Sequence, residues 1–352
     1  MHKIVIEDIC EICSEKIDWE KFKKKRVLIT GARGYIATYL VCSLLRLNDI
    51  YHLDIQVLAL CRGKQLSETH YSEFMNRDDF QLVIQDVCEK LDPRCCADII
   101  IHAASIANIY SQQNNPYDTL KANIIGLNNM LDLCEQHNCE QLLFFSSFLV
   151  YGNVNEKMKE NSTHLGILDF RDIRNSYALS KQMGELMLNS KKKSGLKTKV
   201  NIVRPLNIYG PGEHFYERKP FTDFLGNLLR SENIILKSDG RQLRSYLYLT
   251  DAVKGIFYIL LYGEDGESYN LASEQNIYRI KQMAQLFADN SKDIKVEMVP
   301  KEESYFTKGN SVMLADMGKL KALGWRESVT LDAGIKRMID WAPDNDFFAD
   351  IK

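Results

Sequence analysis

The chain has 352 residues, of which 45% are hydrophobic and 26% charged, a composition typical of a soluble globular protein. This length suits one large domain, or a core domain with an appended lobe. The formal net charge of -2 excludes an overall field that would attract nucleic acid or an anionic membrane.

The N-terminal 20 residues carry acidic side chains throughout and have neither a long apolar core nor a small-residue cleavage site, so we expect no signal peptide. No apolar stretch approaches the roughly 20 residues that span a bilayer. We therefore predict a cytoplasmic protein whose nine cysteines are reduced thiols. The pair Cys10 and Cys13, and the group Cys134, His137 and Cys139, each lack the second pair that a closed zinc site needs. We predict no metal site.

Strands and helices alternate after a short amphipathic helix predicted over residues 5–22. A helix is expected after the first strand, to about Leu47, and two more over Pro116–His137 and Tyr177–Asn189. Apolar runs predict strands over Val27–Thr30, Gln56–Cys61, Phe80–Gln85, Ile99–His102, Gln141–Ser146 and Lys199–Val203. Strands that are apolar along their length and alternate with helices indicate a parallel sheet covered on both faces, in a doubly wound, Rossmann-type α/β fold.

A smaller C-terminal lobe is expected, because the alternation ends after about Pro211. Helical patterns follow over Phe221–Arg230, Thr250–Leu261 and Ile280–Asp289, with short apolar runs between them. We divide the chain into an N-terminal helical extension (1–24), a main α/β domain (25–210) and a lobe (211–352) that is interleaved with the sheet.

A glycine turn follows the first predicted strand. Residues 31–37 have the pattern G-x-x-G-x-x-A, with Gly31 and Gly34 flanking Arg33, and Tyr35 and Ile36 opening the helix. Glycine lets the backbone turn sharply and approach a pyrophosphate, whose charge meets the helix N-terminus. Because the pattern lies between a strand and a helix, it predicts a dinucleotide site.

The end of the second strand bears on the choice between NAD and NADP. An acidic residue there binds the ribose hydroxyls of NAD, whereas arginine accommodates the extra phosphate of NADP. The segment 60–64 has Arg62 and no acid, and Arg33 could face the same phosphate. We therefore favour NADP(H), with NAD(H) as the alternative.

Ser147, Tyr177 and Lys181 are the predicted catalytic residues. Ser147 follows an apolar strand, and Tyr177 and Lys181 lie four residues apart on one helix face. A neighbouring lysine cation favours the tyrosinate and lowers the tyrosine pKa from about 10. The tyrosine could then exchange a proton with a hydroxyl or carbonyl oxygen held by the serine, while a nicotinamide exchanges hydride.

These motifs, in this order, resemble the nucleotide-sugar branch of the extended short-chain dehydrogenase/reductase family over about residues 25–340. The segment 145–152 resembles S-S-x-x-V-Y-G, which assigns the catalytic hydroxyl to Ser147 and not Ser146. Besides the glycine turn, Arg62, Tyr177 and Lys181, the resemblance implies cofactor contacts from Asp86, Val87, Ala103, Ala104, Ser105 and Asn123.

The resemblance also implies a nucleotide-sugar substrate and a role in polysaccharide biosynthesis. Segment 204–211 resembles R-P-x-N-x-Y-G-P, in which Asn207 contacts the nucleotide-sugar, and Arg244 matches an arginine that grips the diphosphate. We expect Ser147 and Phe221 to contact substrate too, with Tyr216 and Phe224 lining the pocket. A homodimer that pairs through helices 116–137 and 177–189 is implied by resemblance.

The chain departs from the family pattern directly after Ser147. Dehydratases of this branch carry Asp-Glu there and decarboxylases keep a glutamate, whereas this chain has Phe148 and Leu149, which transfer no proton. This favours a 4-epimerase or a 4-keto-sugar reductase, and these two stay open. A 4,6-dehydratase or a decarboxylase is the alternative. A non-catalytic NADP-sensing scaffold is an alternative of another class, which the presence of Tyr177 and Lys181 disfavours.

Overall fold

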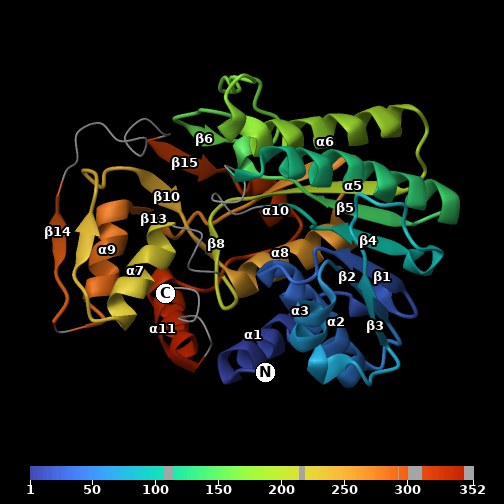
Figure 1. Cartoon of the computed structure of the whole chain (residues 1–352), viewed down its shortest axis with the longest axis horizontal. Coiled ribbons are helices and arrows are strands. Elements are labelled where there is room, and N and C mark those ends of the chain that lie inside the picture. The colour runs from blue at the N-terminus through green and yellow to red at the C-terminus, as the bar shows by residue number, and fades with distance from the viewer. Residues whose placement is uncertain (107–113, 214–218, 292, 300–310, 345–352) are drawn as a thin grey trace.

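The computed structural model describes residues 1–106, 114–213, 219–291, 293–299 and 311–344. Its centre is a seven-stranded parallel sheet with the order β12-β7-β5-β4-β1-β2-β3 (Figure 1). The strands are β1 (Arg26–Thr30), β2 (Gln56–Cys61), β3 (Phe80–Ile84), β4 (Ile99–His102), β5 (Gln141–Phe145), β7 (Lys199–Pro205) and β12 (Glu267–Leu271). Val27 of β1 lies opposite Val57 on one side and Ile99 on the other. The predicted Rossmann-type fold is confirmed.

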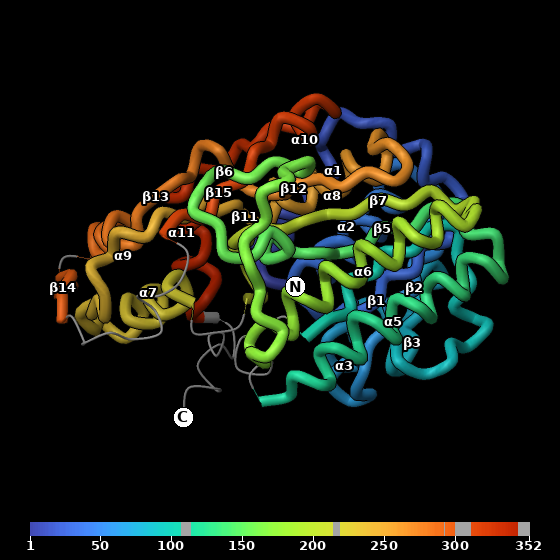
Figure 2. The backbone as a smooth tube through the Cα atoms, turned by 90° about the horizontal axis from the view of Figure 1, so that it is seen from above, coloured from blue at the N-terminus to red at the C-terminus, as the bar shows by residue number. Residues whose placement is uncertain are grey.

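Helices cover both faces of this sheet, because neighbouring side chains of a strand point to opposite faces. Leu28 of β1 packs in the core below α5 (Pro116–His137) and α6 (Ser176–Lys193). Val27 and Ile29 pack in the core shared with α2 (Tyr35–Tyr51) and α8 (Leu249–Tyr262). Figure 2 shows α5 and α6 running side by side. The short α3 (Lys64–His70) follows β2.

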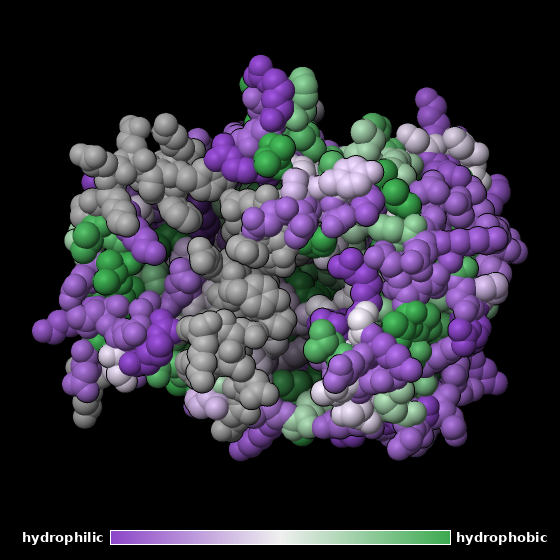
Figure 3. Space-filling view, viewed as in Figure 1, coloured by the Kyte–Doolittle hydropathy of each residue, from purple (hydrophilic) through white to green (hydrophobic). Residues whose placement is uncertain are grey.

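The smaller lobe has its own hydrophobic core, which includes Phe224, Phe287 and Met338. Its helices are α7 (Pro220–Leu229), α9 (Ile280–Ala288) and α11 (Leu331–Trp341), while α10 (Gly318–Ala322) lies against α8 and β12. Its short strands are β8 (Ile208–Tyr209), β9 (Ile234–Leu236), β10 (Leu243–Ser245), β11 (Leu247–Tyr248), β13 (Ile277–Arg279), β14 (Val296–Met298) and β15 (Val312–Ala315), and β15 also pairs with β6 (Lys157–Met158). On the face of the molecule seen in Figure 1, hydrophilic residues cover most of the sheet domain, with small hydrophobic patches between them (Figure 3).

The structure corrects one predicted helix and shows how the lobe and the sheet are interleaved. The predicted helix over 5–22 is wrong at its C-terminal end: α1 (Lys3–Cys13) stops early, and a separate 3-10 turn covers Trp19–Phe22. Strand β12 and helix α8 lie beyond residue 211 yet pack in or on the main sheet. The interleaving of lobe and sheet is therefore extensive.

Candidate active site

The glycine turn packs directly against the end of β4. Gly31 has φ +64, and a Cβ atom there would lie 2.6 Å from the Cα atom of Ala104. Gly34 precedes the first residue of α2 in extended conformation, so the helix N-terminus begins at Tyr35. This close approach requires glycine at position 31, and it brings the predicted cofactor residues Gly31 and Ala104 together.

Arg62 and Asp86 meet at the carboxyl ends of β2 and β3. Nη1 of Arg62 lies 3.4 Å from an oxygen of Asp86, and Nη1 of Arg33 donates to the carbonyl oxygen of Arg62 over 3.1 Å. Burial would raise the pKa of Asp86, but hydrogen bonds from the backbone N–H and the thiol of Cys88, together with the Arg62 charge, outweigh burial and lower this pKa. The ion pair leaves the exposed guanidinium with other N–H groups that can face a ligand.

The end of β4 is held by a hydrogen bond between two buried side chains. The Thr30 hydroxyl lies 2.8 Å from Nδ1 of His102 and accepts from the backbone N–H of Ala104 over 3.1 Å. Burial, together with the charge of Lys181, lowers the pKa of His102 to about 3. The imidazole is therefore neutral at physiological pH, and it contacts the Thr30 hydroxyl that holds the Ala104 N–H.

Three predicted ligand residues present buried polar atoms that have no hydrogen-bond partner among the described residues. These atoms are the Ser105 hydroxyl, Oδ1 of Asn123 and Nδ2 of Asn207. The other end of the Asn123 amide is fixed, since Nδ2 donates to the Ser180 hydroxyl over 2.8 Å. Buried polar atoms are normally paired, so these atoms fit contacts to a bound ligand.

Lys181 is pinned between α6 and the end of β5. Its side chain is 1% exposed, and its ammonium donates to the carbonyl oxygen of Phe145 over 2.7 Å. The same nitrogen lies 5.7 Å from the ring centre of Tyr177 and 4.9 Å from that of Phe144. Burial lowers the pKa of Lys181 to about 7, against the opposing charge of Glu185. The structure thus brings Tyr177 and Lys181 together.

Ser147 and Ser146 have different environments. Ser147 caps the 3-10 turn Phe148–Tyr151 by accepting from the Leu149 N–H over 3.2 Å, and Gln182 of α6 donates to Val150 of this turn over 2.7 Å. Ser146, only 3% exposed, donates instead to the Glu185 carboxylate over 2.5 Å. The Ser146 hydroxyl is therefore engaged within the protein, which agrees with the choice of Ser147.

Glu185 is a site residue that the sequence-based prediction missed. It lies one helical turn after Lys181 and accepts from Nε and Nη2 of Arg204 over 2.9 and 2.5 Å. Nη1 of Arg204 donates to the hydroxyl of Tyr151, which donates to Oδ1 of Asn270 over 2.7 Å. The i to i+4 spacing from Lys181 was the available signal.

The predicted substrate residues lie at the lobe. Asn207 directly precedes β8 and has φ +44, and Arg244 lies in β10 with Nη1 donating to the Leu243 carbonyl over 2.9 Å. Burial lowers the pKa of Arg244. Phe221 is only 3% exposed and packs in the lobe core with its ring centre 4.3 Å from that of Tyr209, as Phe224 also packs in this core. Tyr216 lies outside the described residues.

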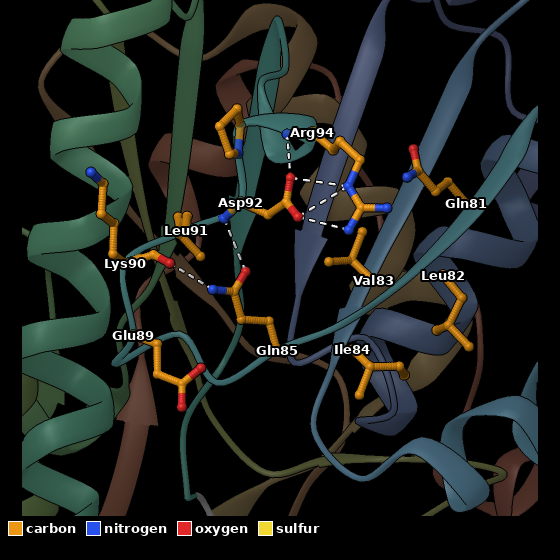
Figure 4. A pocket seen from close by; sticks show the side chains of 11 residues that line it. Gln81, Leu82, Val83, Ile84, Gln85, Glu89, Lys90, Leu91, Asp92 and Arg94 are labelled. Atoms are coloured by element: carbon orange, nitrogen blue, oxygen red, sulfur yellow. Dashed lines mark hydrogen bonds and ion pairs between the residues drawn. The ribbon is translucent and has the colours of Figure 1, made fainter.

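One surface pocket lies at the outer edge of the sheet, beside β3 (Figure 4). There the Gln85 side chain donates to the Lys90 carbonyl and accepts from the Asp92 N–H, and Arg94 forks onto the Asp92 carboxylate. Because β2, β1 and β4 separate β3 from β5, this pocket is distant from Ser147. The side chains of Gln85, Asp92 and Arg94 are paired within the pocket itself.

Within the parts of the chain that the structure describes, no group of three or more His, Cys, Asp or Glu side chains could hold a metal ion. All nine cysteines are free thiols. None of the described helices combines the length and the apolar character that crossing a membrane requires.

The glycine turn, the α2 N-terminus and the Ser147, Tyr177 and Lys181 arrangement define an NAD(P)-dependent enzyme of the extended short-chain dehydrogenase/reductase type. The sequence pattern of the NAD dependent epimerase/dehydratase family matches residues 27–272, and the chain belongs to this family.

Among curated relatives, human dTDP-D-glucose 4,6-dehydratase is 26% identical over 336 residues, which cover 91% of each chain. UDP-glucuronic acid decarboxylase 4 of Arabidopsis thaliana is 28% identical over 322 residues, covering 91% of this chain and 69% of that protein. The fold matches a dTDP-glucose 4,6-dehydratase from Streptomyces venezuelae solved with NAD (TM-score 0.75, 22% identity, 93% and 100% covered). It also matches the UDP-glucose 4-epimerase of Thermotoga maritima solved with UDP-glucose (TM-score 0.74, 21% identity, 93% and 100% covered).

Proposed function

We propose that this enzyme transfers hydride at C4 of the sugar in a nucleotide-sugar, as a 4-epimerase or as a reductase of a 4-keto sugar. The observation that carries this choice is the chemistry beside Ser147. Phe148 is buried with its ring 5.2 Å from that of Tyr151, and Leu149 is apolar. Neither can serve as the second acid or base that dehydration needs.

Ser147, Tyr177 and Lys181 would then handle one proton. Tyr177 accepts the proton of the C4 hydroxyl in the oxidative direction and returns a proton to the C4 carbonyl oxygen in the reductive direction. Ser147 holds this oxygen by a hydrogen bond. Lys181, held by the Phe145 carbonyl, places its charge beside the Tyr177 ring. A bound nicotinamide supplies or accepts the hydride.

The residues of the cofactor domain fit a dinucleotide. The glycine turn at Gly31 would allow the approach of a pyrophosphate, and Ser105 and Asn123 have buried polar atoms that lack a partner among the described residues. We propose NADP(H) as the favoured cofactor, on the grounds of Arg62 and Arg33. NAD(H), with which the Streptomyces venezuelae dehydratase was solved, is the alternative.

The substrate would be held by Asn207 and Arg244. A guanidinium offers a planar fork to the diphosphate oxygens, and Nδ2 of Asn207 is a buried donor that lacks a partner in the described part of the chain. The rings of Phe221 and Phe224 are buried in the lobe core, so we expect these residues to shape the substrate site by packing.

The deciding experiment incubates the protein with a panel of sugar nucleotides and their 4-keto derivatives, with and without NADPH, and follows mass and NMR. Conversion without added NADPH and without a mass change indicates an epimerase. A gain of two hydrogens with NADPH consumption indicates a reductase. Loss of water or of carbon dioxide would contradict the proposal in favour of a dehydratase or a decarboxylase. If the wild-type protein turns over a sugar nucleotide and Tyr177→Phe abolishes this turnover, the protein is not a non-catalytic scaffold.

We further propose a cytoplasmic homodimer that acts in polysaccharide biosynthesis. In support of the dimer, apolar side chains are exposed on the paired helices: Tyr117, Leu120 and Ile125 on α5, and Met183 and Leu186 on α6. Light scattering coupled to gel filtration tests it: the wild-type mass should be twice 40.6 kDa, and Leu186→Glu should halve it. A monomeric wild-type protein would contradict the dimer.

A further inference from the structure

Helix α1 lies between the sheet domain and the smaller lobe. It packs against α2 and α8 on one side and against α11 on the other (Figure 1). The side chain of Val5 contacts both hydrophobic cores, that of the sheet domain and that of the lobe. This helix precedes residue 27, where the match to the family pattern begins, so the family match assigns it no role.

One carboxylate of α1 collects donors from three different elements. Asp8 is 0% exposed. It accepts from the Tyr39 hydroxyl of α2 over 2.8 Å, from the Tyr248 hydroxyl of β11 over 2.9 Å and from Nη1 of Arg337 of α11 over 2.5 Å. Glu11, one turn further on, binds Lys254 of α8 over 2.8 Å and Arg337 over 3.1 Å.

The Asp8 contact to Tyr248 leads directly to a substrate residue. Leu247, the neighbour of Tyr248 in β11, donates its backbone N–H to the carbonyl oxygen of Asn207 over 3.1 Å. Strands β11 and β8 are paired in parallel, with Leu247 opposite Ile208. Asp8 therefore connects with Asn207 through one side chain and one backbone hydrogen bond.

The contact of Asp8 to Tyr39 leads to the cofactor end. Tyr39 lies one helical turn after Tyr35, the first residue of α2. The Tyr35 hydroxyl donates to the carbonyl oxygen of Ile208 over 2.9 Å. Helix α2 therefore contacts the β8–β11 pair in two ways: directly through Tyr35, and through Asp8, which binds both Tyr39 and Tyr248.

We infer that α1 is a positioning element of the active site, in which Asp8 fixes the distance between the cofactor helix α2 and the substrate strands β8 and β11. This inference rests on the proposed nucleotide-sugar function for the identity of the substrate. Removing a carboxylate from water costs free energy that an apolar side chain of similar size would not incur, so stability alone is a weak explanation for Asp8. Its three directional hydrogen bonds define an arrangement of elements that apolar packing would leave less specific.

The test replaces single donors around Asp8. Tyr248→Phe removes the β11 contact and Tyr39→Phe removes the α2 contact, and both keep the buried ring. We expect either change to raise the KM for the nucleotide-sugar about three- to tenfold, which is less than the loss of a direct hydrogen bond to a charged group would cause, because Asp8 does not itself contact the substrate. The value of kcat and the Kd for the cofactor should stay within about twofold of wild type. Glu7→Gln, which alters an exposed carboxylate of the same helix, is the matched control and should change nothing.

A lower Tm with an unchanged KM in both tyrosine variants would overturn the inference and leave Asp8 a structural residue. If the wild-type protein turns over no sugar nucleotide, the proposed function fails, and hydrogen exchange then decides the inference separately. Backbone amides of residues 206–209 and 246–249 should exchange faster in Tyr248→Phe than in Glu7→Gln. Equal exchange in these two variants would refute the positioning role.

Discussion

The ammonium of Lys181 donates to the carbonyl oxygen of Phe145 over 2.7 Å, and Phe145 lies two residues before Ser147. This bond joins α6, which carries Tyr177, to the end of β5, which precedes Ser147. It fixes the position of the ammonium, which lies 5.7 Å from the ring centre of Tyr177. The lysine therefore holds α6 and the end of β5 at a fixed separation, in addition to its proposed role as a charge.

Lys181→Ala should therefore lower kcat more than Lys181→Arg. Alanine removes both the charge and the contact to Phe145, whereas arginine keeps a charge but places it with a different geometry. We expect a loss of about 10²-fold or more for alanine. Steady-state kinetics with Lys193→Ala, an exposed cation near the end of the same helix, provides the control. Equal losses in the two Lys181 variants would refute the charge argument.

Tyr177→Phe should lower kcat by about 10²- to 10⁴-fold while cofactor binding and the fold persist. Only the deprotonated phenol can accept the proton of the sugar hydroxyl, so wild-type kcat in the oxidative direction should fall as the pH is lowered. The pH profile is measured under conditions in which chemistry limits the rate. A flat profile there would contradict the role of Tyr177 as the base.

Ser147→Ala should mainly lower kcat and Ser146→Ala should mainly lower stability, although the two residues are adjacent. Ser147→Ala should reduce kcat by about tenfold or more, because the reacting oxygen loses a hydrogen bond in the transition state. Ser146→Ala removes a buried donor to Glu185 and should lower the free energy of unfolding by about 1 kcal/mol, with kcat within a few-fold of wild type. Kinetics and denaturant unfolding of both variants give the comparison. The reverse pattern would assign catalysis to Ser146.

Arg62→Ala should weaken NADPH binding by about tenfold or more and NADH binding much less, because a phosphate would lose a charge-assisted hydrogen bond. Titrations of both cofactors, followed by protein fluorescence, measure the two Kd values. The control is Arg46→Ala, which removes a cation near the C-terminal end of α2, away from the glycine turn. Equal losses for NADPH and NADH would mean that Arg62 makes no contact with the extra phosphate.

Local signals predicted the sheet domain well, because its strands are apolar and its glycine turn has a distinctive pattern. The helix Pro116–His137 agrees with the prediction at both ends, as do the strands over 56–61 and 99–102. The seventh strand, β12, was missed. It pairs with β7, more than 60 residues earlier in the chain, and only this pairing makes Glu267–Leu271 a strand.

The sequence predicted those site residues whose side chains take part in the proposed reaction. It did not predict the residues that hold the site in place through contacts between distant elements. Tyr177 and Lys181 were predicted from their spacing, and Ser147 was chosen over Ser146 through the family resemblance. The ion pairs of Asp8 with Arg337 and of Glu185 with Arg204 could not be predicted, since each joins residues that are far apart in the sequence or on different elements. The two-residue strands β8 and β11 are likewise defined by each other and not by their own sequence.

The stability of the protein should carry a pH dependence that originates at Asp8. Burial raises the pKa of Asp8 from 3.8 to about 6, against the hydrogen bonds from Tyr39 and Tyr248 and the charge of Arg337, while the nearby charge of Glu11 raises it further. In the unfolded chain the carboxyl returns to its ordinary pKa, so it ionises more readily there than in the folded protein. The contribution of Asp8 is therefore fully present below about pH 4 and is lost as the pH rises through about 6, by at most about 3 kcal/mol.

Asp8→Asn isolates this contribution, because asparagine is neutral at every pH. We expect the free energy of unfolding of the wild-type protein, minus that of Asp8→Asn, to decrease between pH 4 and pH 7. Other carboxylates oppose this trend, among them Glu274, whose pKa is about 2, since the hydrogen bonds and charges of Lys157 and Lys321 outweigh its burial. The difference between the two proteins cancels their effect. Urea unfolding at several pH values, with Glu7→Gln as the control, provides the measurement. A constant difference would show that folding leaves the pKa of Asp8 unchanged, and a difference that rises with pH would show that the folded protein favours the ionised form; either result contradicts the prediction.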